Sequence, residues 1–379
     1  MSARIQLEKI VLVKPFVPPI EELAPYLERI WASRQLTNGG PLHGELEKVL
    51  CGVFNVPAVS LTVNGTMALI LSLKVLGVKG EVITTPFTSP ATIQAILWNN
   101  LKPVYVDVRE EDLNMDPTLI ESAITPRTSA ILPVHVFGIP CDTDAIGLLS
   151  RRYHLKVVYD AAHCFGVLKD GRQVSGLGDL SAISFHATKV FSTIEGGAIL
   201  CHDEMIRERL ESFRNTGIVP DGNLSGMGLN AKMNEIQAAI GLCSLKYTDQ
   251  VIAGRKAATI KYRELLGEVS GLRLWSDVPG IHWNYCYFPV IIDPEVFGAE
   301  RDDLCIYLRE HGITTRKYFY PLVSSVPELK GRGSRNLPVA SRAAKNIVCL
   351  PLYHDLEDRQ IERITDLICR FRSIHHIGT

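Results

Sequence analysis

The feature that most restricts the fold of this chain is a regular alternation of short β-branched runs with helical stretches between residues 58 and 160. Strands are predicted at 58–63, 81–85, 102–107, 129–136 and 156–160. Helices are predicted between them at 66–76, 90–99, 116–124 and 142–154. Because the strands are apolar and are joined by helices, the pattern indicates an α/β fold with a mostly parallel sheet covered on both faces.

The pattern changes after residue 178. Predicted strands at 180–185 and 197–201 are too close for a crossover helix, so an antiparallel pair is the simpler interpretation. Helices are predicted next at 203–213 and 234–247. A smaller α+β domain is expected from about Gly254, with helices at 256–266, 301–311 and 358–372 and an aromatic strand at 285–290. We therefore predict a large domain, residues 1–250, and a small C-terminal domain, residues 251–379.

Composition and charge exclude several classes of protein. The chain has 40 Lys and Arg against 41 Asp and Glu, a net charge of −1, and lacks the basic stripe of a nucleic-acid binder. Nucleic acid is therefore not expected as a partner. No stretch approaches the roughly 20 apolar residues of a spanning helix, so a membrane is not expected as a partner either. The nine cysteines are scattered and never spaced C-x-x-C, which indicates reduced thiols in a cytoplasmic protein without a metal site.

Ligands of a doubly wound sheet bind at the carboxyl ends of its strands, and polar or aromatic residues occur there. Gly65 and Thr66 open a helix after the first strand, where free N–H groups bind phosphate well. Phe87 follows the second strand. Asp160 ends the fifth, where a carboxylate is costly unless it meets a cation or hydrogen-bond donors. Lys189 follows the next strand, and an amine held out of bulk water there becomes nucleophilic because its pKa falls.

Each of these residues also has a structural explanation. Gly65 and Thr66 suit a helix cap, Phe87 a packed core and Asp160 a capping carboxylate, and Lys189 can extend to solvent. Together they fit one cofactor, pyridoxal 5′-phosphate. Its phosphate would lie on Gly65 and Thr66, its ring against Phe87, and its pyridine nitrogen beside Asp160, while Lys189 would form the Schiff base.

The sequence resembles the sugar-nucleotide aminotransferases of the DegT/DnrJ/EryC1/StrS group, which are fold type I pyridoxal-phosphate enzymes. The likeness runs over nearly the whole chain. It is carried by LTNGGP at 36–41, NGT at 64–66, PFT at 86–88, DAAH at 160–163, SFHATK at 184–189, EGG at 195–197 and GLNAKMNEIQAA at 228–239.

The resemblance implies roles for individual residues. Lys189 would carry the proton between cofactor and substrate, and Asp160 would pair with the pyridinium nitrogen. His163 would lie near the cofactor ring or its phenolic oxygen. Ser184 would join Gly65 and Thr66 around the phosphate. Asn230 would reach the phosphate of a neighbouring subunit, which implies a homodimer with shared sites.

Two positions depart from the group's usual pattern. Many relatives have Arg where this chain has Lys232, and many have Gln where it has His163. Some relatives have His in place of the Schiff-base lysine and act as dehydratases, and Lys189 argues against that activity here.

The implied reaction transfers an amino group from L-glutamate to a keto-sugar nucleotide. The run at 184–191 looks most like members that aminate C4 of dTDP-4-keto-6-deoxyglucose to give dTDP-4-amino-4,6-dideoxyglucose, for O-antigen or glycosylated natural products. Alternatives are C3 amination of a dTDP-3-keto-6-deoxyhexose and amination of a GDP- or UDP-linked 4-keto sugar. Dehydration of the same nucleotide sugar and a non-catalytic cofactor-binding sensor are further alternatives.

Candidate substrate contacts are less constrained by the sequence. Arg316, Lys317, Tyr318 and Tyr320 form a basic, aromatic stretch ahead of Pro321. This stretch either meets the diphosphate or the sugar, or it is a solvated loop. Asn38 and His186, which lie in two of the shared motifs, are also expected to contact substrate.

Overall fold

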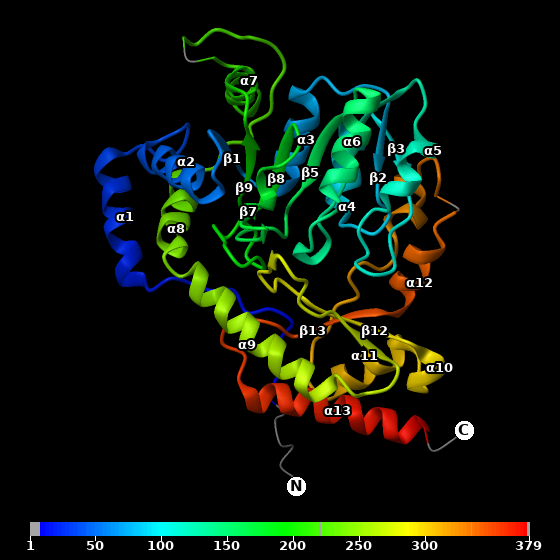
Figure 1. Cartoon of the computed structure of the whole chain (residues 1–379). Helices are drawn as coiled ribbons and strands as arrows, with labels where there is room; N and C mark the ends of the chain where they lie inside the picture. The colour runs from blue at the N-terminus through cyan, green and yellow to red at the C-terminus, as the bar shows by residue number, and fades with distance from the viewer. Residues whose placement is uncertain (1–7, 220, 335, 377–379) are drawn as a thin grey trace.

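The computed structural model describes residues 8–219, 221–334 and 336–376, so residues 1–7 and 377–379 of the two predicted domains lie outside it. A seven-stranded sheet forms the centre of the large domain, in the order β1-β9-β8-β5-β4-β2-β3 (Figure 1). Its strands are β1 (Ala58–Thr62), β2 (Glu81–Thr84), β3 (Lys102–Tyr105), β4 (Thr128–Leu132), β5 (Lys156–Asp160), β8 (Leu180–Ser184) and β9 (Gly197–Cys201).

The pairing confirms the predicted sheet. β2 pairs in parallel with β3 and β4, and the parallel ladder continues through β4–β5 and β5–β8. β9 is antiparallel to both of its neighbours, so Gly197 faces Thr62 of β1 on one side and Ser184 of β8 on the other. The carboxyl ends of β1, β5 and β8 therefore meet at one edge of the sheet.

Helices cover both faces of the sheet (Figure 1). α3 (Gly65–Val75) packs on β8 and β9 and against α4 (Pro90–Trp98) and α7 (Glu204–Arg214). Because α3 lies between the sheet and other helices, most of its side chains are buried. α6 (Thr143–Tyr153) is capped by Asp142. Its buried face packs in an apolar cluster with side chains of β2, β4 and β5. The predicted helix at 116–124 is shorter, a 3₁₀ turn followed by α5 (Ile120–Ala123).

Two helices before β1 were not predicted, α1 (Ile20–Ser33) and α2 (Pro41–Phe54). α2 packs against β1 and α8 (Glu235–Leu245). α9 (Thr248–Leu266) starts eight residues before the predicted helix at 256–266 and runs from the large sheet to the small domain (Figure 1). Gly254 lies inside α9, and a side chain is excluded there because a Cβ would come within 2.1 Å of the carbonyl oxygen of His354. The division at residue 250 stays a prediction, since it falls inside this helix.

The small domain is built on an antiparallel sheet of β10 (Leu272–Leu274), β12 (Phe288–Ile292) and β13 (Ile347–Leu350). Its helices are α10 (Pro294–Phe297), α11 (Arg301–Glu310), α12 (Pro338–Asn346) and α13 (Asp358–His376). The predicted strand at 285–290 is displaced toward its C-terminal end, because Tyr285 adopts a left-handed conformation with φ 51°.

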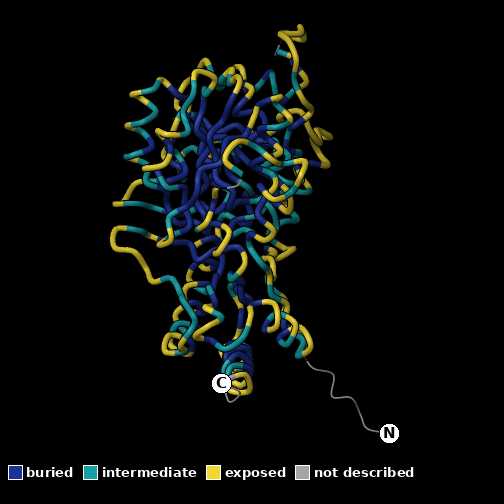
Figure 2. The backbone as a smooth tube through the Cα atoms, turned by 90° about the vertical axis from the view of Figure 1, so that its right-hand side faces the viewer, coloured by how far each residue is buried: buried dark blue, intermediate teal, exposed yellow. Residues whose placement is uncertain are grey.

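Two features join the domains. Ile10 bridges Ile313 of the small domain, so the chain before α1 lies beside that domain. A second small sheet combines β6 (Leu168–Lys169) and β7 (Arg172–Gln173) with β11 (Ile281–His282). Figure 2 shows the buried backbone concentrated in the large domain and continuing as a narrower column below it. Within the described ranges, no helix combines the length and the apolar composition needed to cross a membrane.

Candidate functional site

A cleft of about 360 Å³ opens at the carboxyl ends of β1, β5 and β8, where the large sheet meets the small domain. It contains nine of the fourteen residues predicted from the sequence. These nine are Gly65, Thr66, Asp160, His163, Ser184, His186, Lys189, Arg316 and Tyr318. Side chains separated by up to about 250 positions in the sequence therefore meet in one place.

The first turn of α3 forms one end of the cleft. Asn64 caps the helix by accepting a hydrogen bond from the Met67 N–H at 2.8 Å, which leaves Gly65 and Thr66 at the open helix N-terminus. A Cβ on Gly65 would come 2.9 Å from the Ser184 Cβ, and a Cβ on Gly197 would come 2.7 Å from the Gly65 nitrogen. Both glycines are required for this close approach. The turn suits an anionic group such as a phosphate.

Asp160 lies at the end of β5 and is buried. One carboxylate oxygen accepts a hydrogen bond from Thr92 Oγ1 at 2.7 Å and the other accepts one from the Ala162 N–H at 3.1 Å. Burial raises the pKa of this carboxyl, and the bonds from Thr92 and Ala162 act in the opposite direction. No cation of the described residues pairs with it within 4 Å. A buried carboxylate of this kind suits a ligand that brings its own positive N–H.

Lys189 follows β8 in a turn closed by its N–H donating to the carbonyl oxygen of His186 at 2.9 Å. Its Nζ lies 3.3 Å from Tyr287 Oη and 5.5 Å from the centre of that ring. Burial lowers the pKa of the amine, while the Asp160 carboxylate acts in the opposite direction. The side chain is half-buried, and the lowered pKa makes its amine more nucleophilic.

His163 is one of two histidines that line the cleft, with His186. Its Nδ1 accepts a hydrogen bond from the Phe137 N–H at 3.2 Å. Its ring is edge-on to Tyr287, with centres 5.2 Å apart, and parallel to Phe319 at 6.3 Å. Burial strongly lowers the pKa of His163, so the ring is neutral.

Phe87 does not line the cleft, in contrast to the sequence-based expectation that the cofactor ring stacks on it. The phenyl ring is completely buried and packs edge-on against Phe319 at 5.4 Å and Phe137 at 6.3 Å. The residue follows β2, but its side chain points into the core beneath the site. Of the two residues expected beside the cofactor ring, His163 lines the cleft and Phe87 does not.

The predicted substrate residues separate into two groups. Arg316 and Tyr318 line the cleft, and the Arg316 guanidinium lies 5.6 Å from the centre of the Tyr318 ring. Lys317 and Tyr320 line an adjoining cleft that also contains Arg316. The Lys317 ammonium is 2.7 Å from the Asp302 carboxylate, so its charge is already partnered.

The other two predicted residues, Asn38 and Asn230, are exposed and lie outside both clefts. Asn230 accepts a hydrogen bond from Lys232 Nζ at 2.9 Å. His186 lies inside the cleft, where its Nδ1 is 2.9 Å from Thr188 Oγ1 and its Nε2 is 3.6 Å from the Glu195 carboxylate.

Two residues of the site were missed from the sequence. Tyr287 contacts Lys189, yet it lay within a predicted aromatic strand whose rings had no assigned direction. Thr92 contacts Asp160 from the first turn of α4, and it donates to the carboxylate while receiving a hydrogen bond from Thr88 at 2.7 Å. The signal available for Thr92 was its place in a helix that begins just after a strand end.

A family model for the DegT/DnrJ/EryC1/StrS aminotransferase family matches residues 19–369 of the chain. The chain belongs to this family. The dTDP-4-amino-4,6-dideoxy-D-glucose transaminase of Shigella dysenteriae is 44% identical over 360 residues, which are 95% of this chain and 98% of the relative. The transaminase of the same name from Escherichia coli is 42% identical over 363 residues, again 95% and 98%. The solved structure of DesI in the presence of its TDP-sugar product has a TM-score of 0.92 at 33% identity, covering 98% of this chain and 95% of DesI.

The protein is thus an aminotransferase, and its cofactor is pyridoxal 5′-phosphate. The residues of the cleft fit that group. The buried Asp160 carboxylate has no cationic partner among the described residues and suits the pyridinium N–H. The glycine-bounded turn at Gly65 suits the phosphate, and the Lys189 amine suits the aldehyde.

Proposed function

We propose that this aminotransferase moves an amino group from L-glutamate to C4 of dTDP-4-keto-6-deoxyglucose, giving dTDP-4-amino-4,6-dideoxyglucose. The reaction class rests on one observation, the Lys189 amine and the unpaired Asp160 carboxylate in the same cleft. The substrate assignment rests on two relatives that are at least 42% identical over almost their whole length. Both are named dTDP-4-amino-4,6-dideoxy-D-glucose transaminase.

Each residue of the cleft has a task in this chemistry. Pyridoxal phosphate, when bound, supplies an electron sink for the charge that develops on the reacting carbon. The Asp160 carboxylate, held by Thr92 and Ala162, keeps a ring N–H in place. The Lys189 amine takes a proton from a substrate carbon at Nζ and returns it, and Tyr287 Oη orients that nitrogen. Gly65, Thr66 and Ser184 bind the phosphate.

The substrate enters past Arg316. Its guanidinium makes no ion pair within the described residues, whereas Lys317 is bound to Asp302. We therefore assign to Arg316 the main contact with an anionic group, the diphosphate of the sugar nucleotide or the carboxylate of glutamate. Tyr318 and His186 lie beside it in the cleft, and Tyr320 and Lys317 in the adjoining one. Asn38 would contact substrate bound to a second subunit.

We also propose a homodimer in which Asn230 completes the site of the partner. Asn230 is exposed and lies outside the cleft of its own chain. The segment just before it in the chain exposes large apolar side chains, including Leu224, 76% exposed, and Met227, 79% exposed. Apolar surface of this kind marks an interface. A mixture of Lys189→Ala and Asn230→Ala subunits should regain activity that neither variant has alone, and a mixture that stays inactive contradicts shared sites.

The location and pathway follow from the same proposal. The nine cysteines are all free thiols, which suits a cytoplasmic enzyme. Its product would serve deoxysugar biosynthesis for O-antigen or a glycosylated natural product.

The proposed reaction is tested with glutamate and a panel of keto-sugar nucleotides, with NMR identification of the product. The panel holds dTDP-4-keto-6-deoxyglucose, a dTDP-3-keto-6-deoxyhexose and GDP- and UDP-linked 4-keto sugars. We expect amination at C4 of the first compound. Preferred amination of another sugar would replace the substrate assignment. A product formed without loss of glutamate would point to dehydration, and binding of cofactor without any product to a sensor.

A further inference from the structure

Behind His163 the chain after β4 makes a tight turn at residues 136–138. Phe137 has φ 54°, a left-handed conformation that a non-glycine residue adopts only when its surroundings hold it there. Gly138 follows with φ 79°, and a Cβ on it would lie 2.9 Å from the His163 carbonyl oxygen. The turn thus rests directly on the main chain of His163, with no space for a side chain between them.

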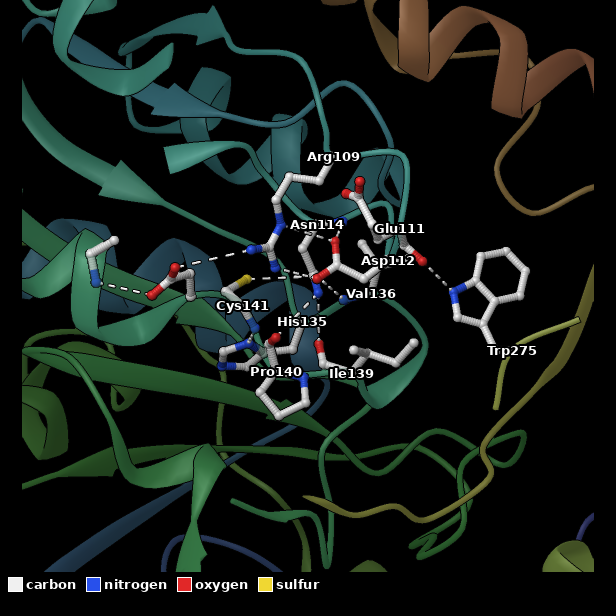
Figure 3. Close-up of polar contacts among 12 residues, drawn as sticks. Arg109, Glu111, Asp112, Asn114, His135, Val136, Ile139, Pro140, Cys141 and Trp275 are labelled. Atoms are coloured by element: carbon white, nitrogen blue, oxygen red, sulfur yellow. Dashed lines mark hydrogen bonds and ion pairs between the residues drawn. The ribbon is translucent and has the colours of Figure 1, made fainter. Parts of the chain in front are cut away.

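A single completely buried amide, that of Asn114, holds both ends of this turn (Figure 3). Its Oδ1 accepts a hydrogen bond from the Val136 N–H at 2.9 Å. Its Nδ2 donates to the carbonyl oxygens of Ile139 at 3.1 Å and Pro140 at 3.3 Å. The amide therefore bonds to the main chain before and after Phe137, which fixes the direction of the Phe137 N–H.

The turn is also held from the small domain. Trp283 Nε1 donates to the Phe137 carbonyl oxygen at 2.8 Å, and Asn284 Nδ2 donates to the His163 carbonyl oxygen at 2.8 Å. These bonds hold the turn and His163 together, so a change in the turn must act on the imidazole.

The Phe137 N–H donates to His163 Nδ1, and this bond determines where the imidazole carries its hydrogen. A neutral imidazole has one N–H and one acceptor nitrogen. Because Nδ1 is the acceptor, the hydrogen must be on Nε2. His163 then offers a hydrogen-bond donor, and not an acceptor, to an oxygen atom of the ligand in the cleft.

We propose that Asn114 is a positioning residue of the active site, which holds the 136–138 turn so that the Phe137 N–H keeps His163 in the single tautomer with its hydrogen on Nε2. Asn114 does not line the cleft and acts only through the turn. This role concerns residues of the chain alone, so it can be tested without the sugar-nucleotide reaction.

The test is NMR of the full-length protein with ¹⁵N-labelled histidine rings, read by long-range nitrogen–proton correlations that distinguish the two tautomers. His163 is assigned by the signal lost in His163→Gln. We expect one tautomer in the wild type, with the hydrogen on Nε2. In Asn114→Ala we expect that single signature to be lost in favour of a mixture with the Nδ1–H form.

Arg109→Gln is the matched control, because the Arg109 side chain pairs with the carboxylates of Asp112 and Asp142 and bonds neither to residues 136–138 nor to the Asn114 side-chain amide (Figure 3). It should keep the wild-type signature. If Asn114→Ala does not fold, Asn114→Asp takes its place, since the carboxylate still accepts from Val136 but cannot donate to Ile139 and Pro140. A wild type with its hydrogen on Nδ1, or a folded Asn114 variant with an unchanged His163 signature, overturns the proposal.

Discussion

The two walls of the cleft are built in opposite ways. In the cofactor wall, Asp160 and His163 are buried and Lys189 is half-buried, and each of these groups bonds to another part of the protein. The substrate wall, residues 315–321, leaves Arg316 and Tyr320 exposed. Burial lowers the pKa of His163 and of Lys189, and hydrogen bonds from Thr92 and Ala162 lower the pKa of the Asp160 carboxyl against the effect of its burial. In the second wall, by contrast, a charged ligand must be able to reach the groups that bind it. Changes in the first wall should therefore alter kcat, and changes in the second should alter KM.

The largest effect is expected from Lys189→Ala, which removes the amine of the cofactor wall. Proton transfer by a positioned base contributes about 10²–10⁴-fold, so amino-sugar formation should fall by at least about 10³-fold. Lys317→Ala removes the same kind of side chain from the substrate wall and should keep kcat. Both are measured as product formed from glutamate and the keto-sugar nucleotide. A Lys189→Ala enzyme that works at the wild-type rate would remove the basis of the comparison.

Arg316→Gln tests the substrate wall. Loss of an unpaired cation that binds an anion should raise KM for an anionic substrate about 10-fold or more, with kcat changed little. Lys317→Gln is the control, because that charge is already bound to Asp302 and its loss should change KM less. Steady-state kinetics in both substrates separates the diphosphate from the glutamate carboxylate. An effect confined to kcat would place Arg316 in the cofactor wall instead.

Tyr287→Phe removes the hydroxyl beside Lys189 Nζ. A neutral hydrogen bond contributes about 0.5–1.5 kcal/mol, so kcat should fall about 2–13-fold while KM stays near the wild-type value. Tyr285→Phe is matched to it, since the Tyr285 hydroxyl bonds to Asp277 and does not line the cleft. Equal rates for the two variants would mean that Tyr287 acts only by packing.

The smallest effect is a pH shift in Thr92→Val. The Thr92 hydroxyl lowers the pKa of Asp160, so its loss should raise that pKa further above the ordinary value. Because the cofactor wall needs the carboxylate form, activity should fall off at a higher pH on the acid side, with the rate at alkaline pH nearly unchanged. Thr259→Val is the control, since Thr259 is a buried threonine on α9 that touches neither Asp160 nor Thr92. The pH dependence of kcat/KM measures the shift, and an unchanged acid limb would contradict it.

The cofactor wall could be predicted from the sequence and the substrate wall only in part. Apolar, β-branched runs locate the strands, and their carboxyl ends converge in any parallel sheet. Asp160, Lys189 and Gly65, which follow such strands, line one cleft in the structure. A strand end does not say where the next side chain points. Phe87 was therefore placed in the site, although its ring is in the core.

The direction of Tyr287 depends on the left-handed turn at Tyr285, which the aromatic pattern does not reveal. The role of Asn114 depends on contacts with residues more than 20 positions further along the chain, and no local motif predicts these contacts. The contrast between Arg316 and Lys317 arises from Asp302, which lies on another element of the small domain. Residues that act through tertiary contacts were thus beyond sequence reasoning, while those at strand ends were within it.

The central claim is that Lys189 is the residue that binds the cofactor covalently. The most direct measurement is reduction of the cofactor-loaded protein with borohydride, followed by digestion and mass spectrometry of the peptides. The account predicts loss of the yellow colour and a phosphopyridoxyl group on the peptide that contains Lys189. A label on any other lysine, or a cofactor that leaves the protein unmodified after reduction, would contradict it.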